Sequence, residues 1–297
     1  MPTSAPQACQ TVQFPDLYAA CETVSAECQQ TFLAVCRAEL AALVFAAALA
    51  ELPRDVLWGI GPKTAWLFFA VALVLRVSGV GRKAEKRWYD ARAAAESIKS
   101  AAWQYAVCGE AFRRDDDTAE SRFTDLLRDV LIALPNLNVP ATPGGCGVTS
   151  EMNALRHRSV DDRISVYVRE RIDDQLLWYA QKAIWNRTRA KWWLGTMISL
   201  EAIAVILGLF RALEVVDVDW LGILSAAAAS VGAWQQVKNY SVLSEAYSVT
   251  SHEVQLVKGS TQPGLSESEW AQAAHDAEAA FSREHKLWVA RRQGPTH

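Results

Sequence analysis

The sequence predicts an all-α membrane protein in which two transmembrane helical hairpins carry long cytoplasmic helical extensions. Apolar residues are gathered into four runs, and the sequence between the runs is largely polar with a helical pattern. Many of the 12 tryptophans lie beside these runs, where amphipathic rings favour the membrane–water interface. Hydrophobic residues make up 51% of the chain and the net charge is only −3, which excludes a disordered chain and a generally basic surface.

The four apolar runs are long enough to span a bilayer. The first hairpin has spans at about residues 33–52 and 64–80, and the second has spans at about 192–213 and 220–237. A hydrocarbon core about 30 Å thick requires about 20 helical residues, so the span at 64–80 is the marginal one. Because charged residues interrupt the runs, a buried helical hairpin in a soluble protein is the alternative interpretation.

Lysine and arginine residues set the expected orientation of both hairpins. Basic residues follow the second span and precede the third, whereas the turns inside the hairpins carry few or none. These flanking residues are Arg82, Lys83, Lys86 and Arg87 after the second span, and Lys182, Arg187, Arg189 and Lys191 before the third. Both hairpins therefore predict a multi-pass protein of a bacterial inner membrane, with both termini and the central region in the cytoplasm.

Three of the charged residues inside the predicted spans have a predicted role in the membrane. Arg76 and Glu39 lie at the same level of the first hairpin, so we expect an ion pair that either fixes the hairpin register or takes part in conduction. Glu201 has Ser230 and Gly232 at the matching level of the fourth span. It therefore needs a partner from the first hairpin or from a neighbouring subunit, or a water-filled lumen, and we favour the lumen.

Helical patterns continue past the spans on the cytoplasmic side. One unbroken helix is predicted over residues 16–52, and the second span is expected to continue through Gln104. A second leading helix begins at about Asp161 and runs into the third span, and the fourth span continues into residues 241–258. A capping box that begins at Ser266 opens a last helix.

The layout is duplicated, because leading helix, span, outer turn, span and trailing helix occur twice. Residues 135–147 contain six Pro or Gly residues and mark the boundary between the halves. The predicted organisation is a first unit at 16–134, a linker at 135–153, a second unit at 154–260 and a C-terminal cytoplasmic helix at 266–292. The halves share little residue identity, so the repeat is one of architecture.

Each half carries a stripe of aromatic and charged residues on one face of a cytoplasmic helix. Residues three or four positions apart share a helix face. The first stripe is Trp88, Arg92, Glu96, Lys99 and Trp103, and the second is Tyr167, Arg171, Gln175, Trp178 and Lys182. Packing and salt bridging between helices explain such stripes more often than ligand binding does.

Motifs for catalysis and metal binding are missing from the sequence. It contains no phosphate-cradling Gly loop, no G-x-S-x-G and no H-E-x-x-H, and its five His residues are scattered. The six Cys residues form no C-x-x-C pair, which favours reduced thiols over a metal site. We therefore expect a protein that is not an enzyme and that uses no cofactor and no metal.

Two patterns in the chain resemble the SLATT family of two-span bacterial effector domains. Residues 87–92 (RWYDAR), 95–99 (AESIK) and 103–105 (WQY) resemble the signature that follows the second span in that family. The second half resembles a sibling SLATT subfamily through Tyr167 and Arg171, Gln175 with Trp178 and Tyr179, and Lys182 with Ala183. The resemblance covers most of residues 30–260, as two SLATT-like units in tandem.

The resemblance implies an antiphage-defence membrane effector, such as the channel of a Hailong-type defence pair. Proteins of this kind are thought to form pores that depolarise or kill the infected cell, under control of a nucleotide or short oligonucleotide made by a partner nucleotidyltransferase. Such a signal needs cations for phosphates and rings for bases. The candidate residues are Arg92, Lys99, Trp103, Arg156, Arg158 and Arg163.

Four spans enclose little water, so a pore requires several copies of the chain around an axis. We expect a homo-oligomer in the lipid bilayer, with a tetramer as the first guess, and no binding of duplex nucleic acid. The alternative function is a membrane-tethered helical scaffold that recruits cytoplasmic partners without conducting ions.

Overall fold

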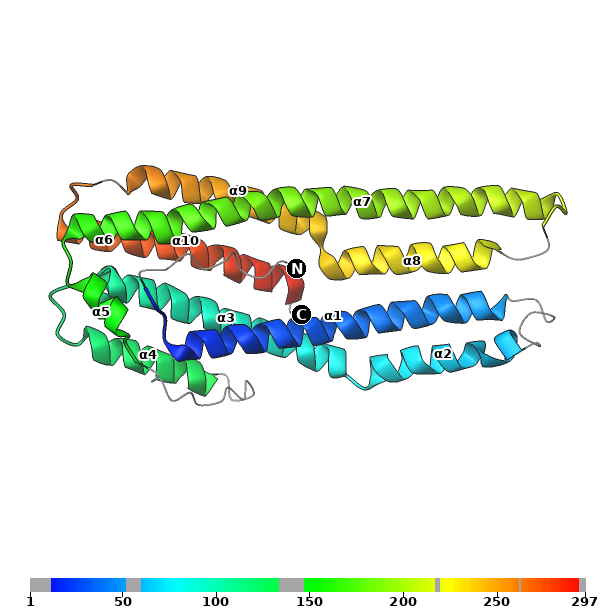
Figure 1. Cartoon of the computed structure of the whole chain (residues 1–297), viewed down its shortest axis with the longest axis horizontal. Coiled ribbons are helices and arrows are strands. Elements are labelled where there is room, and N and C mark those ends of the chain that lie inside the picture. The colour runs from blue at the N-terminus through cyan, green and yellow to red at the C-terminus, as the bar shows by residue number, and fades with distance from the viewer. Residues whose placement is uncertain (1–11, 52–59, 134–146, 217–219, 262, 294–297) are drawn as a thin grey trace. The chain divides into compact units, whose positions relative to one another are not determined.

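A computed structural model of the chain describes residues 12–51, 60–133, 147–216, 220–261 and 263–293. All regular secondary structure in these residues is helical (Figure 1), which confirms the predicted fold class. The helices are α1 (Asp16–Ala50), α2 (Ile60–Val77), α3 (Val80–Ala106), α4 (Ala119–Ala133), α5 (Ser150–Arg156), α6 (Val160–Tyr167), α7 (Asp173–Ala212), α8 (Trp220–Lys238), α9 (Tyr240–Ser260) and α10 (Glu267–Gln293), with a 3₁₀ turn (η2, Glu110–Phe112) and a π-helical turn (η4, Val168–Ile172).

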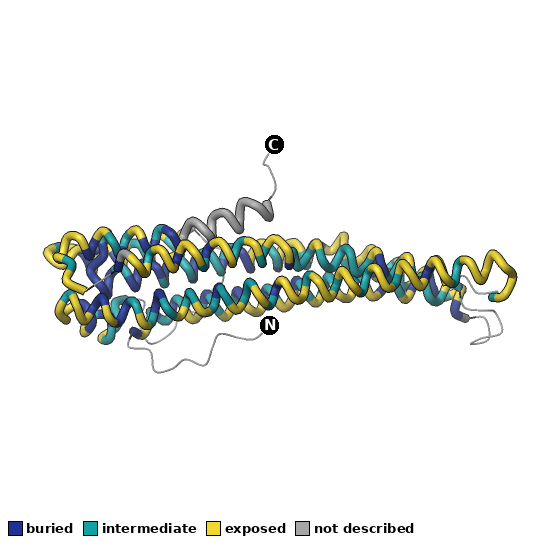
Figure 2. Tube along the Cα trace, turned by 90° about the horizontal axis from the view of Figure 1, so that it is seen from above, coloured by how far each residue is buried: buried dark blue, intermediate teal, exposed yellow. Residues whose placement is uncertain are grey.

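The chain divides into two compact units. The core unit consists of Met1–Glu27, Arg87–Lys182 and Ala246–His297, and the span unit consists of Cys28–Lys86 and Ala183–Glu245. Each unit therefore contains chain from both halves of the sequence. Buried residues are concentrated in the core unit, and exposed residues follow the helices of the span unit (Figure 2).

Large apolar side chains cover the outside of the span unit. Phe69 and Val74 on α2 are 53% and 65% exposed, and Val205 and Leu209 on α7 are 70% and 58% exposed. In the most apolar 18-residue stretch of each of three long helices, only 6–17% of the residues are buried. A soluble protein would cover such a surface, whereas a bilayer solvates it. The exposure therefore favours membrane spans over a buried soluble hairpin.

Three helical stretches of the described chain are long and apolar enough to cross a membrane: Asp16–Ala50, Gly61–Ala106 and Val160–Ala212. They contain the first three predicted spans. The fourth predicted span coincides with α8, which is helical over 19 residues. Its mean hydropathy is too low for it to be counted with the other three. Polar residues such as Gln235 and Gln236 near its end reduce its hydropathy. On this evidence alone, the fourth span stays a prediction.

Contacts between neighbouring helices define both hairpins of the span unit. In the first hairpin, the rings of Phe45 and Phe68 lie 6.0 Å apart. In the second, a Cβ placed on Gly208 would lie 3.6 Å from Leu221, and one placed on Gly232 would lie 3.8 Å from Met197. This antiparallel register sets Ala228 opposite Glu201, so the expected match of Glu201 with Ser230 and Gly232 is wrong by a few residues. The error comes from counting through the turn without knowing where each helix ends.

The two leading helices are continuous, as predicted. Helix α1 is uninterrupted, and helical structure continues from α6 through η4 into α7. The two trailing helices are not continuous with their spans, which corrects the prediction. Gly79 separates α2 from α3 with a φ of +69°, and Asn239 separates α8 from α9 with a φ of +53°. Gly and Asn tolerate this left-handed conformation better than other residues do.

In each half, the trailing helix packs antiparallel to its own leading helix. Arg92 of α3 forms an ion pair with Glu22 of α1. In the second half, the Trp178 ring of α7 contacts the Tyr247 ring of α9 with 5.4 Å between centroids, and Ser244 donates a hydrogen bond to the carbonyl oxygen of Ala183. These corresponding contacts support a duplicated architecture.

Side-chain caps begin two helices of the second half, and one of them, the capping box at Ser266, was predicted. Ser159 caps α6 by accepting a hydrogen bond from the Asp162 amide, one residue from the expected start. The capping box before α10 is present, since the Ser266 amide bonds Glu269 at 2.9 Å. The Pro/Gly-rich segment at 135–146 and the turns at 53–59 and 217–219 lie outside the described residues.

Candidate functional site

Three aromatic rings build the centre of the core unit. Trp103 of α3, Tyr167 of α6 and Trp270 of α10 are almost completely buried. The ring centroids of Trp103 and Tyr167 lie 5.6 Å apart, as do those of Tyr167 and Trp270, and both pairs meet edge to face. Trp103 of the first stripe thus contacts Tyr167 of the second stripe. Helix α10 packs on Tyr167 through Trp270.

A buried ion pair lies next to these rings. Arg171, in the π-helical turn η4, donates from Nε and Nη2 to the two carboxylate oxygens of Glu278 on α10, at 2.9 and 2.8 Å. The Tyr167 hydroxyl donates to the same carboxylate at 2.8 Å. Burial opposes the charge on Arg171, but the Glu278 carboxylate outweighs it and raises the Arg171 pKa. Burial also raises the pKa of Tyr167 well above its ordinary value.

The charged residues of the first stripe behave differently from one another. Arg92 is paired on both sides, with Glu96 at 2.5 Å and Glu22 at 3.2 Å, and Glu96 raises the Arg92 pKa. Lys99 has no hydrogen bond or ion pair with the described residues. Burial lowers the Lys99 pKa, and the positive charge of Arg171 lowers it further.

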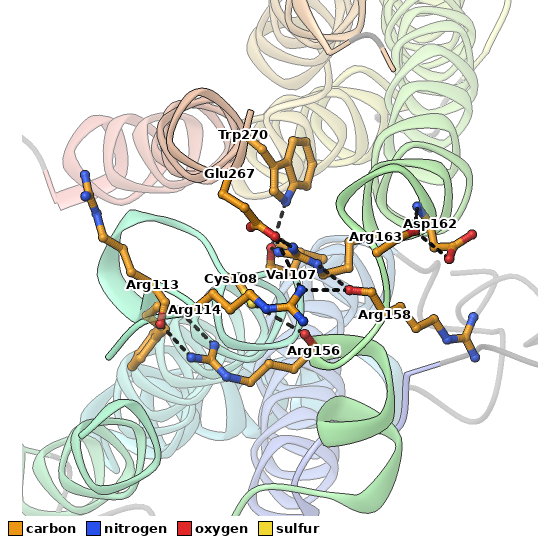
Figure 3. Close-up of polar contacts among 12 residues, drawn as sticks. Val107, Cys108, Arg113, Arg114, Arg156, Arg158, Asp162, Arg163, Glu267 and Trp270 are labelled. Atoms are coloured by element: carbon orange, nitrogen blue, oxygen red, sulfur yellow. Dashed lines mark hydrogen bonds and ion pairs between the residues drawn. The ribbon is translucent and has the colours of Figure 1, made fainter. Parts of the chain in front are cut away.

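Arg156, which the sequence assigned to signal binding, holds the segment after α3 in place (Figure 3). Its Nη1 donates to the carbonyl oxygens of Tyr105 at 3.0 Å and Phe112 at 2.8 Å, and its Nη2 donates to the carbonyl oxygen of Arg113 at 2.6 Å. The guanidinium also lies 4.7 Å from the Tyr105 ring centroid. A positive charge at the end of a helix complements its orphan carbonyl groups.

Arg163 has a similar role at the same helix end. Its Nη1 donates to the carbonyl oxygen of Val107 at 2.9 Å, and the same oxygen accepts a 2.7 Å bond from the Trp270 indole. Arg163 also pairs with Glu267 of α10. The chain leaves the helix at Cys108, whose φ is +59°, so these bonds stabilise a sharp turn (Figure 3).

Of the three arginines near this turn that were predicted to bind the signal, only Arg158 has an exposed side chain. It points away from the cluster (Figure 3), and its guanidinium has no hydrogen-bond partner among the described residues. The donors of Arg156 and Arg163 are engaged inside the protein. A signal-binding role for these two arginines stays a prediction that their contacts do not support.

The remaining stripe residues make packing contacts in the core unit. Trp88 stacks on Tyr89 with 4.8 Å between ring centroids. Lys182 lies 5.6 Å from the Trp178 ring centroid, and its pKa is lowered by burial. Gln175, on the same face of α7, is half-buried. Trp178 also contacts Tyr247 of α9, which agrees with the interpretation of the second stripe as a helix interface.

Of the three span residues with a predicted role in the membrane, Glu39 and Arg76 pair as predicted. Arg76 Nε donates to Glu39 at 2.7 Å across the first hairpin. Glu201 is exposed on α7, and it has no hydrogen-bonded or ion-paired partner in the described chain. Whether any of these residues lines a pore stays a prediction.

A double-mutant cycle tests the ion pair in the first hairpin. We expect Glu39→Gln and Arg76→Gln each to lower the free energy of unfolding in detergent, because each leaves a single charge in an apolar surrounding. The double variant should regain part of the loss, with a coupling energy of about 1 kcal/mol. Thermal unfolding followed by circular dichroism measures the unsubstituted protein, both single variants and the double variant. Strictly additive losses of stability would contradict the pairing.

Sequence analysis missed the contribution of α10 to this site. It predicted the helix but assigned no role to Glu267, Trp270 or Glu278, which bind partners from three other segments. A signal was present, because Glu278 lies on the apolar face of its helix, whose other members are Trp270, Ala274, Ala277 and Phe281. A charge on such a face needs a buried partner.

Two protein-family models match the chain in tandem. The model of SMODS and SLOG-associating 2TM effector domain 3 matches residues 15–164, and that of SMODS and SLOG-associating 2TM effector domain 1 matches residues 167–288. The chain belongs to the SLATT family. No curated protein and no solved structure matches it significantly.

The first SLATT match begins just before α1 and ends within α6, and the second runs from the last residue of α6, Tyr167, through most of α10. Because both SLATT domains are two-transmembrane effector domains, the chain is a membrane effector protein. Two such domains imply four spans, which supports α8 as the fourth. Lys99 and Trp103 belong to the first SLATT domain, and Arg171 and Glu278 belong to the second.

Proposed function

We propose that this SLATT protein is the pore-forming effector of an antiphage-defence system. Several copies, four in our first guess, would assemble in the bacterial cell membrane into an ion channel that depolarises the cell when open. A nucleotide or short oligonucleotide from a partner nucleotidyltransferase would control the gate. The observation that carries the proposal is Glu201, a carboxylate on the exposed apolar surface of α7. Lipid opposes such a charge, whereas a water-filled lumen between copies accommodates it.

The signal would act on the core unit, which we place in the cytoplasm. There the two SLATT domains contact each other through the rings of Trp103 and Tyr167, one helical turn from Lys99 and Arg171, so a ligand beside that contact would be able to change how the domains pack. Helices α1 and α7 continue without a break from the core unit into the spans. They give a direct route from signal to pore.

Conductance across planar bilayers tests the proposed channel. We expect the purified full-length chain to produce ion currents that change when short oligonucleotides are added on the core-unit side. Currents in neither condition, from protein shown to be inserted, would contradict the channel. That result would favour the membrane-tethered scaffold. The extensive pairing of both stripes inside the protein is also compatible with a scaffold.

Replacing Glu201 tests the lumen directly. We expect Glu201→Gln to reduce the preference of the channel for cations severalfold, because it removes a ring of negative charge from the pore. Glu253→Gln, on an exposed position of α9, removes the same charge outside the spans and should leave selectivity unchanged. Reversal potentials under a salt gradient measure the effect, and equal values for Glu201→Gln and the unsubstituted protein would place Glu201 outside the lumen.

A further inference from the structure

Two hydrogen-bond donors in the interior of the core unit have no acceptor. The indole Nε1 of Trp103 and the Nη1 of Arg171 are buried and bond to no atom of the described residues. The two side chains are only 1% and 2% exposed. Buried donors are nearly always satisfied in native proteins, so an unsatisfied one points to a partner that binds there.

Lys99 adds a third donor at the same place. It lies one helical turn from Trp103 on the same face of α3, and Arg171 lies one helical turn from Tyr167, whose ring centroid is 5.6 Å from that of Trp103. The positive charge of Arg171 also lowers the Lys99 pKa. Its ammonium group has neither a hydrogen bond nor an ion pair within the described parts of the chain. Unlike Trp103 and Arg171, Lys99 is only partly buried, which leaves a route from solvent.

The carboxylates near these donors are already engaged. Glu278 accepts two bonds from Arg171 and one from Tyr167. Glu96 pairs with Arg92 at 2.5 Å, and Glu22 pairs with the same guanidinium. The remaining capacity of the site therefore consists of donors, two of them positively charged.

We propose that Lys99, Arg171 and Trp103 form a binding site for one oxyanion, which in the protein's signal is a phosphate group. This inference rests on the proposed function for the identity of the signal, but the anion site itself does not require a channel. An oxyanion accepts several hydrogen bonds at once and separates the two like charges. Water would satisfy the donors without relieving the repulsion.

The geometry also limits what the site recognises. The Trp103 ring already contacts the rings of Phe14 and Tyr167, at 6.0 and 5.6 Å between centroids. It therefore offers its N–H group rather than an open face for base stacking. The site reads phosphate, and base recognition must come from other residues.

The π-helical turn η4 provides the position of Arg171. This turn, Val168–Ile172, interrupts a helix that is otherwise regular from Val160 to Ala212. Turns of this kind occur frequently at functional sites, because they displace one side chain from the regular helical position. The displaced turn belongs to the second SLATT domain and Lys99 to the first, so a bound anion links the two domains.

Thermal-shift measurements on the full-length chain in nanodiscs test the site, with sodium pyrophosphate and a 5′-phosphorylated short oligodeoxynucleotide as separate probes and sodium chloride as the ionic-strength control. We expect both phosphate probes to raise the melting temperature, and Lys99→Met to weaken their apparent affinity at least tenfold. Trp103→Phe, which removes the indole N–H together with part of the ring and keeps an aromatic side chain, should weaken it severalfold. Lys86→Met is the matched control, since Lys86 is an exposed lysine on the same helix, and it should respond like the unsubstituted protein.

Lys99→Met should fold, because methionine replaces a partly buried cation, which has no ion pair with the described residues, by an apolar side chain of similar length. Its melting temperature without probes checks this. An unchanged response of Lys99→Met to both probes would overturn the site. A second outcome would also overturn the site: Lys99→Met still responds to the oligonucleotide, and pyrophosphate has no effect. The signal would then bind elsewhere.

Bilayer recordings separate this inference from the proposed function. Currents that lose their oligonucleotide response in Lys99→Met but not in Lys86→Met support both. Lys99-dependent binding of the probes without any current supports the anion site and contradicts the channel. An oligonucleotide-responsive current that is the same in Lys99→Met as in the unsubstituted protein supports the channel and overturns the anion site.

Discussion

Replacing Glu278 with Gln is expected to lower the free energy of unfolding of the core unit by about 3–5 kcal/mol, because it leaves a buried arginine without a countercharge. Arg171 and Glu278 are 2% and 1% exposed, and two hydrogen bonds join them. The amide keeps the shape of the carboxylate and one acceptor oxygen, so the loss reports on charge rather than on packing. For a unit of this size the melting temperature should fall by about 6–20 °C.

Circular dichroism melts in detergent measure this effect, and Glu253→Gln is the control. Glu253 is an exposed glutamate on α9, where the same change should alter stability by no more than about 0.5 kcal/mol. The double variant Arg171→Met with Glu278→Leu should be more stable than Glu278→Gln, since it removes both charges. Equal melting temperatures for Glu278→Gln and Glu253→Gln would contradict the buried pair.

Replacing Arg156 with Met should cost about 2–4 kcal/mol, because three backbone carbonyl groups lose their donor at the turn after α3. Arg156 bonds all three through one guanidinium and is only 8% exposed. Methionine fills much of the volume but donates no hydrogen bond. The turn that leads to η2 should loosen, and α4 and α5 should lose their fixed positions beside it.

Hydrogen–deuterium exchange locates the effect, with faster exchange expected over residues 105–113. Arg158→Met is the matched control, because Arg158 lies two residues away with an exposed side chain, and its stability should be unchanged. The two variants also separate the roles predicted from the sequence. If Arg156→Met melted like the unsubstituted protein but lost its response to oligonucleotides, Arg156 would bind the signal and would not act as a structural cap.

Much of the fold was predictable because its determinants are local. The apolar runs, the capping box at Ser266 and the periodicity of α1 and α7 each depend on a few adjacent turns of helix. The pairing of Glu39 with Arg76 followed from counting depth along a short hairpin. The breaks at Gly79 and Asn239 also had a local signal, since Gly and Asn are the residues that adopt a positive φ. The prediction followed the helical pattern instead and extended each span into its trailing helix without a break.

The site was less predictable because it depends on which segment covers each stripe. Periodicity correctly set Lys99 and Trp103 on one face, and Tyr167 and Arg171 on another. It did not reveal that the two faces meet, or that Glu278 of α10 neutralises Arg171. Arg156 and Arg163 were predicted as phosphate ligands because their sequence neighbours are basic. Side-chain patterns do not report the backbone carbonyl groups around the end of α3 to which both donate, and they did not reveal the pairing of Arg163 with Glu267.

The two hairpins carry different charges, a Glu39–Arg76 pair in the first and an isolated Glu201 in the second. Because one polypeptide contains both hairpins, every assembly of whole chains has the two kinds of hairpin in equal numbers. The total number of hairpins is therefore even. A ring of n chains then has n-fold symmetry with two kinds of wall segment, unlike a ring built from single-hairpin subunits. In the proposed ring, fusion would let one hairpin keep a neutral ion pair while the other presents its carboxylate to the axis.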